Sequence, residues 1–219
     1  PMVINTPYID DFDDIVHMSG NIIFEKDTYF KSPVFIHKGT NINLYPGVSL
    51  IFKNKVIAVG DVDNKIKITS ALGKPWGTFA IVGEKASGSI LSNIIIENGS
   101  GELTKTTQFT SLLSIHDTKN ININNCIIRD NKIYDDMLHI VYSTGVNISS
   151  CVFNNSFSDA IDIDLSEVKI SNIEVHNAGN DAIDLMGSNV YIKDSLLKNS
   201  KDKGVSVGEG SKVLIRNSG

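Results

Sequence analysis

Short bursts of alternating apolar and polar residues recur along the last third of the chain. The segments TGVNISSCVFNNSFSDAIDID, SEVKISNIEVHNAGNDAIDLMG and SNVYIKDSLLKNSKDKGVSVGEG align on one another. Their equivalent valines, and that of a fourth partial copy, follow in steps of 22, 22 and 23 residues: Val146, Val168, Val190 and Val213. A period in this range is the signature of a solenoid, in which each repeat contacts only its neighbours.

Each period holds three bursts, and each burst predicts a short strand with one face turned inward. In one period they are Val168/Ile170, Ile173/Val175 and Ile183/Leu185. An asparagine stands at one fixed place between the second and third bursts, at Asn98, Asn155, Asn177 and Asn199. Asparagine tolerates left-handed backbone and can bond a stacked neighbour, so this column predicts a ladder that holds a turn. Because the turns accept insertions and no hexapeptide pattern is present, we expect an all-β, right-handed parallel β-helix with three strands per coil of about 22 residues.

Residues 1–30 do not match the repeat, and we expect a lead-in or cap there, followed by one β-helix domain over residues 31–219. An acidic run lies in the first segment, at Asp10, Asp11, Asp13 and Asp14. It lacks the glycine and distal glutamate of an EF-hand loop. Because the chain stops inside a repeat, we expect additional coils, a further domain or a partner subunit at the C-terminal edge.

Composition narrows the class of partner. The net charge of −5 and the pI near 5.5 argue against nucleic acid, which would call for a basic stripe. No apolar run is long enough to span a membrane, and no signal peptide opens the sequence. The two cysteines, Cys126 and Cys151, fall at equivalent places in neighbouring coils, and stacked inward thiols fit them better than a disulfide.

The order of segments resembles a known family. GTNINLYPGVSLIF, KPWGTFAIVG and LSNIIIENGSG, followed by SDAIDID, NDAIDLMGSNV and DKGVSVGEGSKV, are similar to bacterial right-handed parallel β-helix repeat proteins of the pectate-lyase-like superfamily, particularly surface-associated members. The resemblance implies an extracellular or cell-surface protein that works on polysaccharide. It leaves activity open, since this architecture hosts lyases, hydrolases, epimerases, phage adhesins and proteins without known activity.

Extending the register toward the N-terminus predicts an acidic outward face. Inward residues recur in steps of 25, 23, 22 and 22, at Ile115, Ile140, Ile163, Leu185 and Val207. The residues before them form an outward column of Ser114, His139, Asp162, Asp184 and Ser206, and those after the first four form another of His116, Val141, Asp164 and Met186. Three residues before the last four members of the first column come Asp136, Asp159, Asp181 and Lys203. We expect Asp162 to lie near Asp184 and Asp164, because stacked strands are about 4.8 Å apart.

Carboxylates so close repel, so either one keeps its proton or a cation lies between them. The first outcome suits a glycosidase and the second a calcium-dependent lyase. We therefore predict catalytic roles for Asp162, Asp184, Asp164, His139 and Lys203, the last two as candidate bases. The tentative metal ligands are Asp162, Asp184 and Asp164, with calcium as the cofactor if one is used. Tyr134 and His116 are the candidate substrate-binding residues.

A structural explanation competes with the catalytic one. The tetrad D-[AG]-I-x is a common turn-to-strand signature, in which Asp159 and Asp181 cap the turns. The Gly-His-Gly turn of the related polygalacturonase-like hydrolases is missing, and the only arginines are Arg129 and Arg216.

Two longer connections, Gly99–Thr110 and Asn131–Asp136, are predicted to project beside His139. Tyr134 on the second stacks a sugar ring or covers the loop's own backbone, and Trp76 packs over a coil edge or offers a sugar platform. The sequence thus predicts a polysaccharide-binding or polysaccharide-modifying protein, a lyase or a glycoside hydrolase if it is an enzyme. The alternative is a non-catalytic surface scaffold or adhesin module. A groove walled by the two loops favours the enzyme, and a flat face favours the scaffold.

Overall fold

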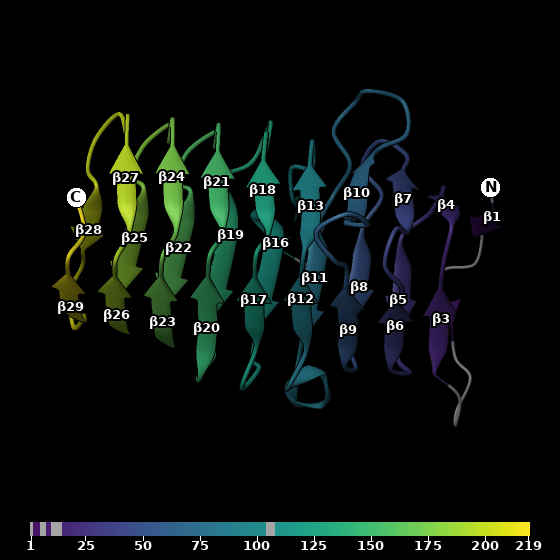
Figure 1. The fold of residues 1–219 in the computed structure, drawn as a ribbon, viewed down its shortest axis with the longest axis horizontal. Helices are drawn as coiled ribbons and strands as arrows, with labels where there is room; N and C mark the ends of the chain where they lie inside the picture. Colours follow the sequence, from purple (N-terminus) through teal and green to yellow (C-terminus); the bar gives the residue numbers. More distant parts are fainter. Residues whose placement is uncertain (1, 5–7, 10–14, 104–107) are drawn as a thin grey trace.

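A computed structural model describes residues 2–4, 8–9, 15–103 and 108–219, which form a parallel β-solenoid (Figure 1). Three sheets of nine strands each run along its length, and the chain passes from one sheet to the next within every coil. One short 3-10 helix, η1 (Glu84–Ala86), interrupts the strands. Among the described residues, no helix has the length and apolar character needed to cross a membrane.

The strands of each sheet are given in spatial order. Sheet A contains β1 (Met2–Ile4), β4 (Asn21–Phe24), β7 (Asn41–Leu44), β10 (Ile66–Ser70), β13 (Ile94–Glu97), β18 (Ile127–Arg129), β21 (Val152–Asn154), β24 (Glu174–His176) and β27 (Leu196–Lys198). Sheet B contains β2 (Tyr8–Ile9), β5 (Thr28–Phe30), β8 (Leu50–Phe52), β11 (Phe79–Val82), β16 (Ser111–His116), β19 (Asp136–Val141), β22 (Ile161–Asp164), β25 (Ile183–Met186) and β28 (Val205–Val207). Sheet C contains β3 (Val16–Met18), β6 (Val34–Ile36), β9 (Val56–Val59), β12 (Ile90–Ser92), β17 (Asn122–Asn124), β20 (Val146–Ser149), β23 (Glu167–Ser171), β26 (Asn189–Lys193) and β29 (Lys212–Arg216). A separate antiparallel hairpin joins β14 (Glu102–Leu103) to β15 (Gln108–Phe109).

Strand pairing begins before the expected domain boundary at residue 31. β3, β4 and β5 already pair in parallel with β6, β7 and β8, so the described part of residues 1–30 supplies strands of all three sheets. The reason is that short alternating bursts such as Ile22/Phe24 bury one face even without a recognisable repeat. A covering role for this segment stays a prediction, and Asp10, Asp11, Asp13 and Asp14 lie outside the described residues.

The core is a column of stacked apolar side chains between the three sheets. Inward residues of successive coils lie directly over one another, and their apolar burial is the main favourable term in folding. In the N-terminal half the column is aromatic: the rings of Phe30 and Phe52 stack with centroids 4.7 Å apart, and Phe79 follows at 4.5 Å. Trp76 is fully buried and its Nε1 donates to the carbonyl of Glu97 at 2.8 Å, which confirms packing at a coil edge. Cys126 and Cys151 are buried free thiols, as expected.

The predicted asparagine ladder is present. Asn155, Asn177 and Asn199 have φ angles of 60°, 58° and 59°, in the left-handed region where asparagine costs less than other side chains. The amide of Asn177 donates to Oδ1 of Asn155 at 3.1 Å, and the amide of Asn199 donates to Oδ1 of Asn177 at 3.2 Å. The ladder therefore stabilises one turn of the repeat both through backbone conformation and through side-chain stacking.

We expect Asn177→Ala to destabilise the protein more than Asn177→Gly. Alanine must adopt the left-handed conformation at a cost of about 1–2 kcal/mol, whereas glycine adopts it freely and loses only exposed amide hydrogen bonds. The midpoint of urea unfolding measures the difference, with Asn189→Ala, on an exposed strand position of β26, as the control. Equal losses for alanine and glycine would show that the amide bonds, and not the backbone, carry the stabilisation.

Candidate functional site

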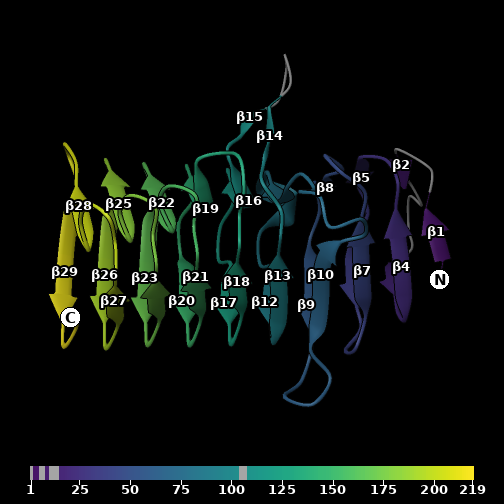
Figure 2. The ribbon, with the colours of Figure 1, turned by 90° about the horizontal axis from the view of Figure 1, so that it is seen from above.

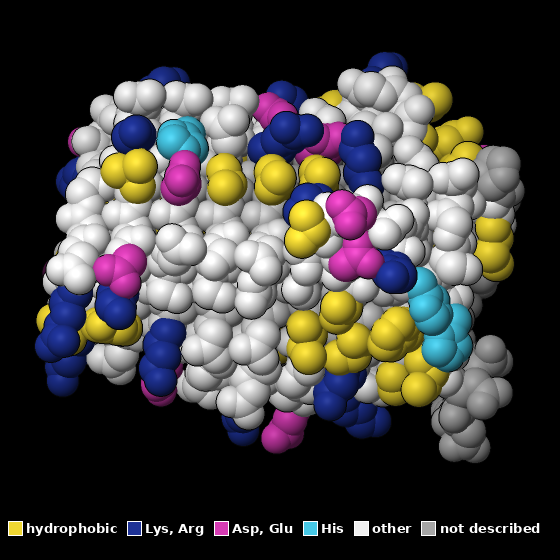
Figure 3. All heavy atoms as spheres, viewed as in Figure 1, with side chains coloured by type: hydrophobic (Ala, Val, Ile, Leu, Met, Phe, Trp, Pro, Cys, Tyr) yellow, Lys and Arg dark blue, Asp and Glu magenta, His cyan; other side chains and the backbone are white. Residues whose placement is uncertain are grey.

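The outward face of sheet B carries the expected columns. Ser114 pairs with His139, His139 with Asp162, Asp162 with Asp184, and Asp184 with Ser206. The second column is also in register, since His116, Val141, Asp164 and Met186 are successive partners. On the faces formed by sheets A and C, by contrast, acidic side chains occur singly or in small groups (Figure 3).

His139 lies at the centre of a polar cluster. Its Nε2 is 3.4 Å from Oδ2 of Asp164 and 3.6 Å from Oδ2 of Asp162, while its Nδ1 is 3.3 Å from Oγ1 of Thr110. Burial lowers the pKa of His139 and outweighs the opposing effect of Asp164. Near neutral pH the imidazole is therefore uncharged and can both donate and accept a hydrogen bond.

Asp136 belongs to this cluster, although sequence reasoning did not select it as a site residue. Its side chain is almost fully buried, and its Oδ2 accepts a hydrogen bond from Oγ1 of Thr110 at 3.3 Å. Burial, followed by the charges of Asp162, Asp135 and Asp159, raises the pKa of Asp136 to about 9. The carboxyl group is thus a neutral acid at pH 7, and Thr110 links it to His139.

Asp162 titrates near neutrality. Burial is the main cause, with the neighbouring Asp164 and Asp184 next, and together they raise its pKa to about 7. Its stacked partner Asp184 lies one coil further along, where its Oδ1 accepts the backbone N–H of Leu185 at 3.0 Å. The raised pKa lets Asp162 keep its proton below about pH 7, and a retained proton relieves the expected repulsion between the outward aspartates.

Asp159 and Asp181 have the structural role that the turn signature predicts. Oδ1 of Asp159 accepts the backbone N–H of Asp181 at 2.7 Å, and Oδ1 of Asp181 accepts the backbone N–H of Lys203 at the same distance. Each carboxyl group thus ties one coil to the next. Asp136 stands in the same column but bonds Thr110, so the turn does not account for it. Its place in this column, ahead of His139, was the signal by which the sequence could have identified it.

Lys203 lies at the edge of the cluster. Its ammonium pairs with Asp202 and is 3.9 Å from Oδ2 of Asp181, and these contacts raise its pKa. A raised pKa keeps the amine protonated, which suits charge stabilisation better than the role of base.

His116 lies beneath the hairpin. Its ring packs edge-on against His139, with centroids 5.1 Å apart, and lies 5.2 Å from the ring of Phe109. Burial lowers its pKa to about 3, and its Nε2 has no hydrogen-bond partner among the described residues. His116 is therefore neutral, and its side chain is only partly exposed.

The two longer connections close one side of the cluster. The β14–β15 hairpin projects from the body beside β16 (Figure 2), and Phe109 packs on Ile51 and Ala80 of the neighbouring strands. Thr110, which follows Phe109, contacts both Asp136 and His139. Ser114 is consequently buried, whereas Asp162 and Asp184 remain partly exposed. The face is therefore walled at its N-terminal side and open toward the C-terminus.

Tyr134 lies on the second connection but lines a separate hollow of about 290 Å³, with Trp76 and Glu102. The connection is held from within, since the amide of Asn131 donates to the carbonyl oxygens of Tyr134 and Asp136 at 3.0 and 3.1 Å. Tyr134 is thus a neighbour of the cluster rather than a member of it.

Within the part of the chain that the structure describes, two sets of side chains could hold a cation. The atoms of Asp136, His139 and Asp162 lie within 4.8 Å of one another, and so do those of Asp135, Asp136 and Asp159. The first set mixes imidazole with carboxylates, which suits a transition metal, while the second offers only oxygen, which suits calcium or magnesium. Of the three expected metal ligands, Asp162 joins a set, whereas Asp164 and Asp184 are in neither. Both sets contain Asp136, which lies one coil closer to the N-terminus than Asp162.

Part of the chain matches a known family model. Residues 136–218, which are 83 of the 219 residues, match the model described as right handed beta helix region. With the three parallel sheets, this match shows the fold to be a right-handed parallel β-helix. A comparison of its sequence with curated proteins gave no match.

Three solved structures are similar to this β-helix at low identity. A putative glycosyl hydrolase from Parabacteroides merdae ATCC 43184 is 12% identical, with 91% of this chain and 82% of that chain covered and a TM-score of 0.38. Full-length tailspike protein 2 from Escherichia coli O157:H7 bacteriophage CAB120 is 10% identical, with 94% and 39% covered and a TM-score of 0.33. The A-module of the mannuronan C-5 epimerase AlgE6 from Azotobacter vinelandii is 8% identical, with 92% and 91% covered and a TM-score of 0.24. At these values the likenesses bear on neither the substrate nor the chemistry of the cluster.

The buried carboxyl of Asp136 predicts a stability that falls as pH rises. The unfolded chain releases this proton near pH 4, its ordinary value being 3.8, and the folded β-helix releases it only near pH 9. Between these values the folded state binds more protons, so the free energy of unfolding decreases from about pH 4 to about pH 9. Asp136→Asn, which stays neutral, is expected to flatten this dependence and to be more stable than the wild type at about pH 9.

Urea unfolding at about pH 5, 7 and 9, with a chelator present to remove cations, measures this effect. Asp63→Asn changes an exposed carboxyl in a surface turn and is expected to keep the wild-type pH dependence. An unchanged pH dependence in Asp136→Asn would show that the carboxyl group is not buried as described.

Proposed function

We propose that this β-helix cleaves glycosidic bonds of a polysaccharide at the cluster formed by Asp136, His139, Asp162 and Asp164. One observation carries the proposal: carboxyl groups and an imidazole from adjacent coils converge on an outward, walled face without serving as turn caps. Outward strand positions impose no need for carboxyl groups, and stacking them is unfavourable without a ligand or a proton. Such strained groupings are typical of functional sites.

The roles of the carboxyl groups follow from their contacts. Asp162, with a pKa of about 7, is suited to protonate the glycosidic oxygen as the general acid. Asp164 is the second carboxyl, and it accepts the proton of the water that attacks the anomeric carbon. Both Oδ2 atoms lie within 3.6 Å of Nε2 of His139, so the imidazole sets their separation. Asp136 and Thr110 in turn orient the imidazole from the other side.

The substrate is a polymer in this proposal because the face is long and open at one end. Sheet B continues past the cluster through β25 and β28, where Asp184 and Ser206 extend the same column. An extended chain of sugars can lie along this row and meet the hairpin wall at the cluster. An extracellular or cell-surface location fits such a substrate and is part of the proposal.

A cation-dependent reaction is the second candidate, favoured by the two close ligand sets that share Asp136. A calcium ion at Asp135, Asp136 and Asp159 would neutralise a sugar carboxylate and favour removal of the neighbouring proton, as in a lyase. His139, which shares the ligand Asp136 with this site, would accept that proton.

We expect Asp162→Asn to lower kcat by about 10²- to 10⁴-fold, the usual contribution of a general acid. Because the acid must be protonated, kcat of the wild type is expected to fall as pH rises above about 7. The release of reducing ends from a panel of neutral, amino and uronate polysaccharides measures activity, and ultraviolet absorbance of unsaturated products separates a lyase from a hydrolase.

Glu174→Gln, an exposed position on sheet A, is the matched control and is expected to retain activity. The wild type and Asp162→Asn could both bind a polysaccharide while neither cleaves it. This result would contradict the enzyme proposal and favour a non-catalytic scaffold or adhesin.

Calorimetric titration tests the cation. If the cluster binds one, we expect Asp136→Asn to abolish binding of both calcium and zinc, because Asp136 belongs to both ligand sets. Asp162→Asn is expected to weaken the binding of zinc but not of calcium, and Asp184→Asn is expected to change the binding of neither cation. If the wild type gives no heat of binding with any cation tested, the cation-dependent lyase reaction is ruled out and metal-free hydrolysis is the candidate that is left.

A further inference from the structure

A hollow of about 290 Å³ opens beside the cluster, where sheet A turns into sheet B. It is lined by backbone and side chains from four successive coils, among them Trp76, Ser100, Glu102, Ile133 and Tyr134. Its volume lies at the lower limit of small-molecule sites, which corresponds to one sugar ring rather than to an oligosaccharide.

Glu102 gives this hollow a polar group that the protein leaves unsatisfied. The residue is only 9% exposed, and its Oε2 has no hydrogen-bond partner among the described residues. Burial raises the pKa of Glu102, and the charge of Asp27 adds to this effect. The hydroxyl of Ser49 favours the ionised carboxylate but does not outweigh them. Buried polar groups in proteins almost always have a partner, so a donor on a bound ligand would complete the hydrogen bonding of Glu102.

Tyr134 gives the hollow an aromatic wall on a rigid support. Its backbone N–H donates to Oγ of Ser100 at 3.2 Å, and Asn131 holds the connection from the other side. Ile133 beside it is 54% exposed, so the wall is apolar and accessible. A half-buried tyrosine with an exposed apolar neighbour is a suitable platform for the apolar face of a sugar.

The hollow and the cluster share both of their connecting segments. Tyr134 is followed directly by Asp135 and Asp136, and two residues span at most about 7 Å. Glu102 begins the hairpin whose other end leads into Thr110, the partner of Asp136 and His139. A polymer lying over the cluster therefore reaches the hollow with a neighbouring sugar.

We propose that this hollow is a subsite that holds one sugar ring of the glycan, stacked on Tyr134 and donating a hydrogen bond to Glu102. The inference rests on the proposed function and adds a substrate class to it. The donor is a hydroxyl of a neutral sugar or the ammonium of an amino sugar. A uronate is disfavoured, because its carboxylate would face the carboxyl group of Glu102, with the charge of Asp27 close to it.

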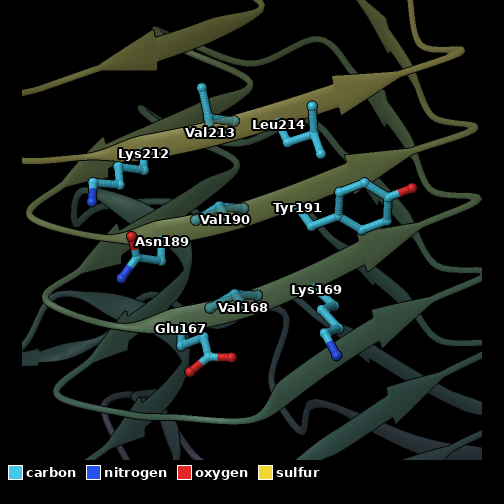
Figure 4. Close-up of a pocket in the computed structure, with 9 residues that line it drawn as sticks. All are labelled: Glu167, Val168, Lys169, Asn189, Val190, Tyr191, Lys212, Val213 and Leu214. Atoms are coloured by element: carbon cyan, nitrogen blue, oxygen red, sulfur yellow. The ribbon is translucent and has the colours of Figure 1, made fainter.

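A larger hollow on sheet C serves as an internal comparison. It has a volume of about 460 Å³ and is lined by Tyr191, Lys169, Lys212 and Leu214 among others, with these side chains standing in rows on the sheet (Figure 4). It lies on a different sheet from the cluster, and Tyr191 therefore provides a matched tyrosine outside the proposed subsite.

The test measures binding of three tetrasaccharides to the Asp162→Asn protein: β-1,4-linked glucosamine, cellotetraose and tetragalacturonate. We expect the glucosamine oligomer to bind most tightly and the galacturonate oligomer not to bind. Adding Tyr134→Ala is expected to weaken binding of both ligands by about tenfold, whereas Tyr191→Ala leaves it unchanged. Glu102→Gln keeps the shape of the side chain and is expected to remove the preference for the amino sugar.

The inference is overturned if none of the three oligomers binds, if Tyr134→Ala and Tyr191→Ala behave alike, or if the galacturonate oligomer binds best. It is also overturned if a crystal structure with the glucosamine oligomer shows only a water molecule on Glu102. Circular dichroism melting of each variant separates loss of binding from loss of folding. Binding is measured in the Asp162→Asn protein, so these outcomes can be interpreted even if the cleavage proposal fails. Cleavage by the wild type that is unchanged by Tyr134→Ala would contradict the subsite but not the cleavage proposal.

Discussion

The structure depends on one constraint, the in-register stacking of parallel strands. Each coil places an equivalent residue about 4.8 Å above the last, so every position of the repeat becomes a column. For asparagine this is favourable, because the amide of Asn177 both donates to Asn155 and accepts from Asn199. For aspartate it is unfavourable, because like charges such as Asp162 and Asp184 are brought together. The ladder and the acidic cluster are therefore two results of the same geometry.

The β-helix tolerates the acidic column by keeping protons on it. Partial burial makes ionisation costly, and the pKa values of Asp136 and Asp162 rise to about 9 and about 7 in response. Burial lowers the pKa of His139 for the same reason, so the imidazole between them is neutral. A row of groups that would repel one another in water thus becomes a set of proton donors and acceptors at fixed separation. Rigid neighbouring strands are a suitable support for such a set, since side chains on strands are placed more accurately than those on loops.

The cluster lies at the boundary between an irregular and a regular half. Two coils ahead of the cluster are longer than the rest, since Leu50, Phe79 and Leu113 are successive partners in sheet B although 29 and 34 residues separate them. The C-terminal coils keep a step of 22 residues, as between Ile163 and Leu185. The longer coils supply the hairpin and the Asn131 connection, and the regular coils supply the columns. The polar cluster lies where projecting loops meet a repeating row of carboxyl groups, so these groups are both aligned and partly desolvated.

The sequence by itself determined the fold, the strand register and the columns. Period and alternation repeat through the C-terminal coils, so the placement of His139, Asp162 and Asp184 on one outward row needed no coordinates. The tertiary structure decided which loop residues contact the side chains of that row. The burial of Asp136, the link through Thr110 and the turning of Tyr134 toward Glu102 all depend on loops that occur once. A repeat shows the same sequence pattern in each coil, so its geometry can be predicted from that pattern. A single insertion is placed by packing against residues distant in the sequence, and no periodic pattern predicts that contact.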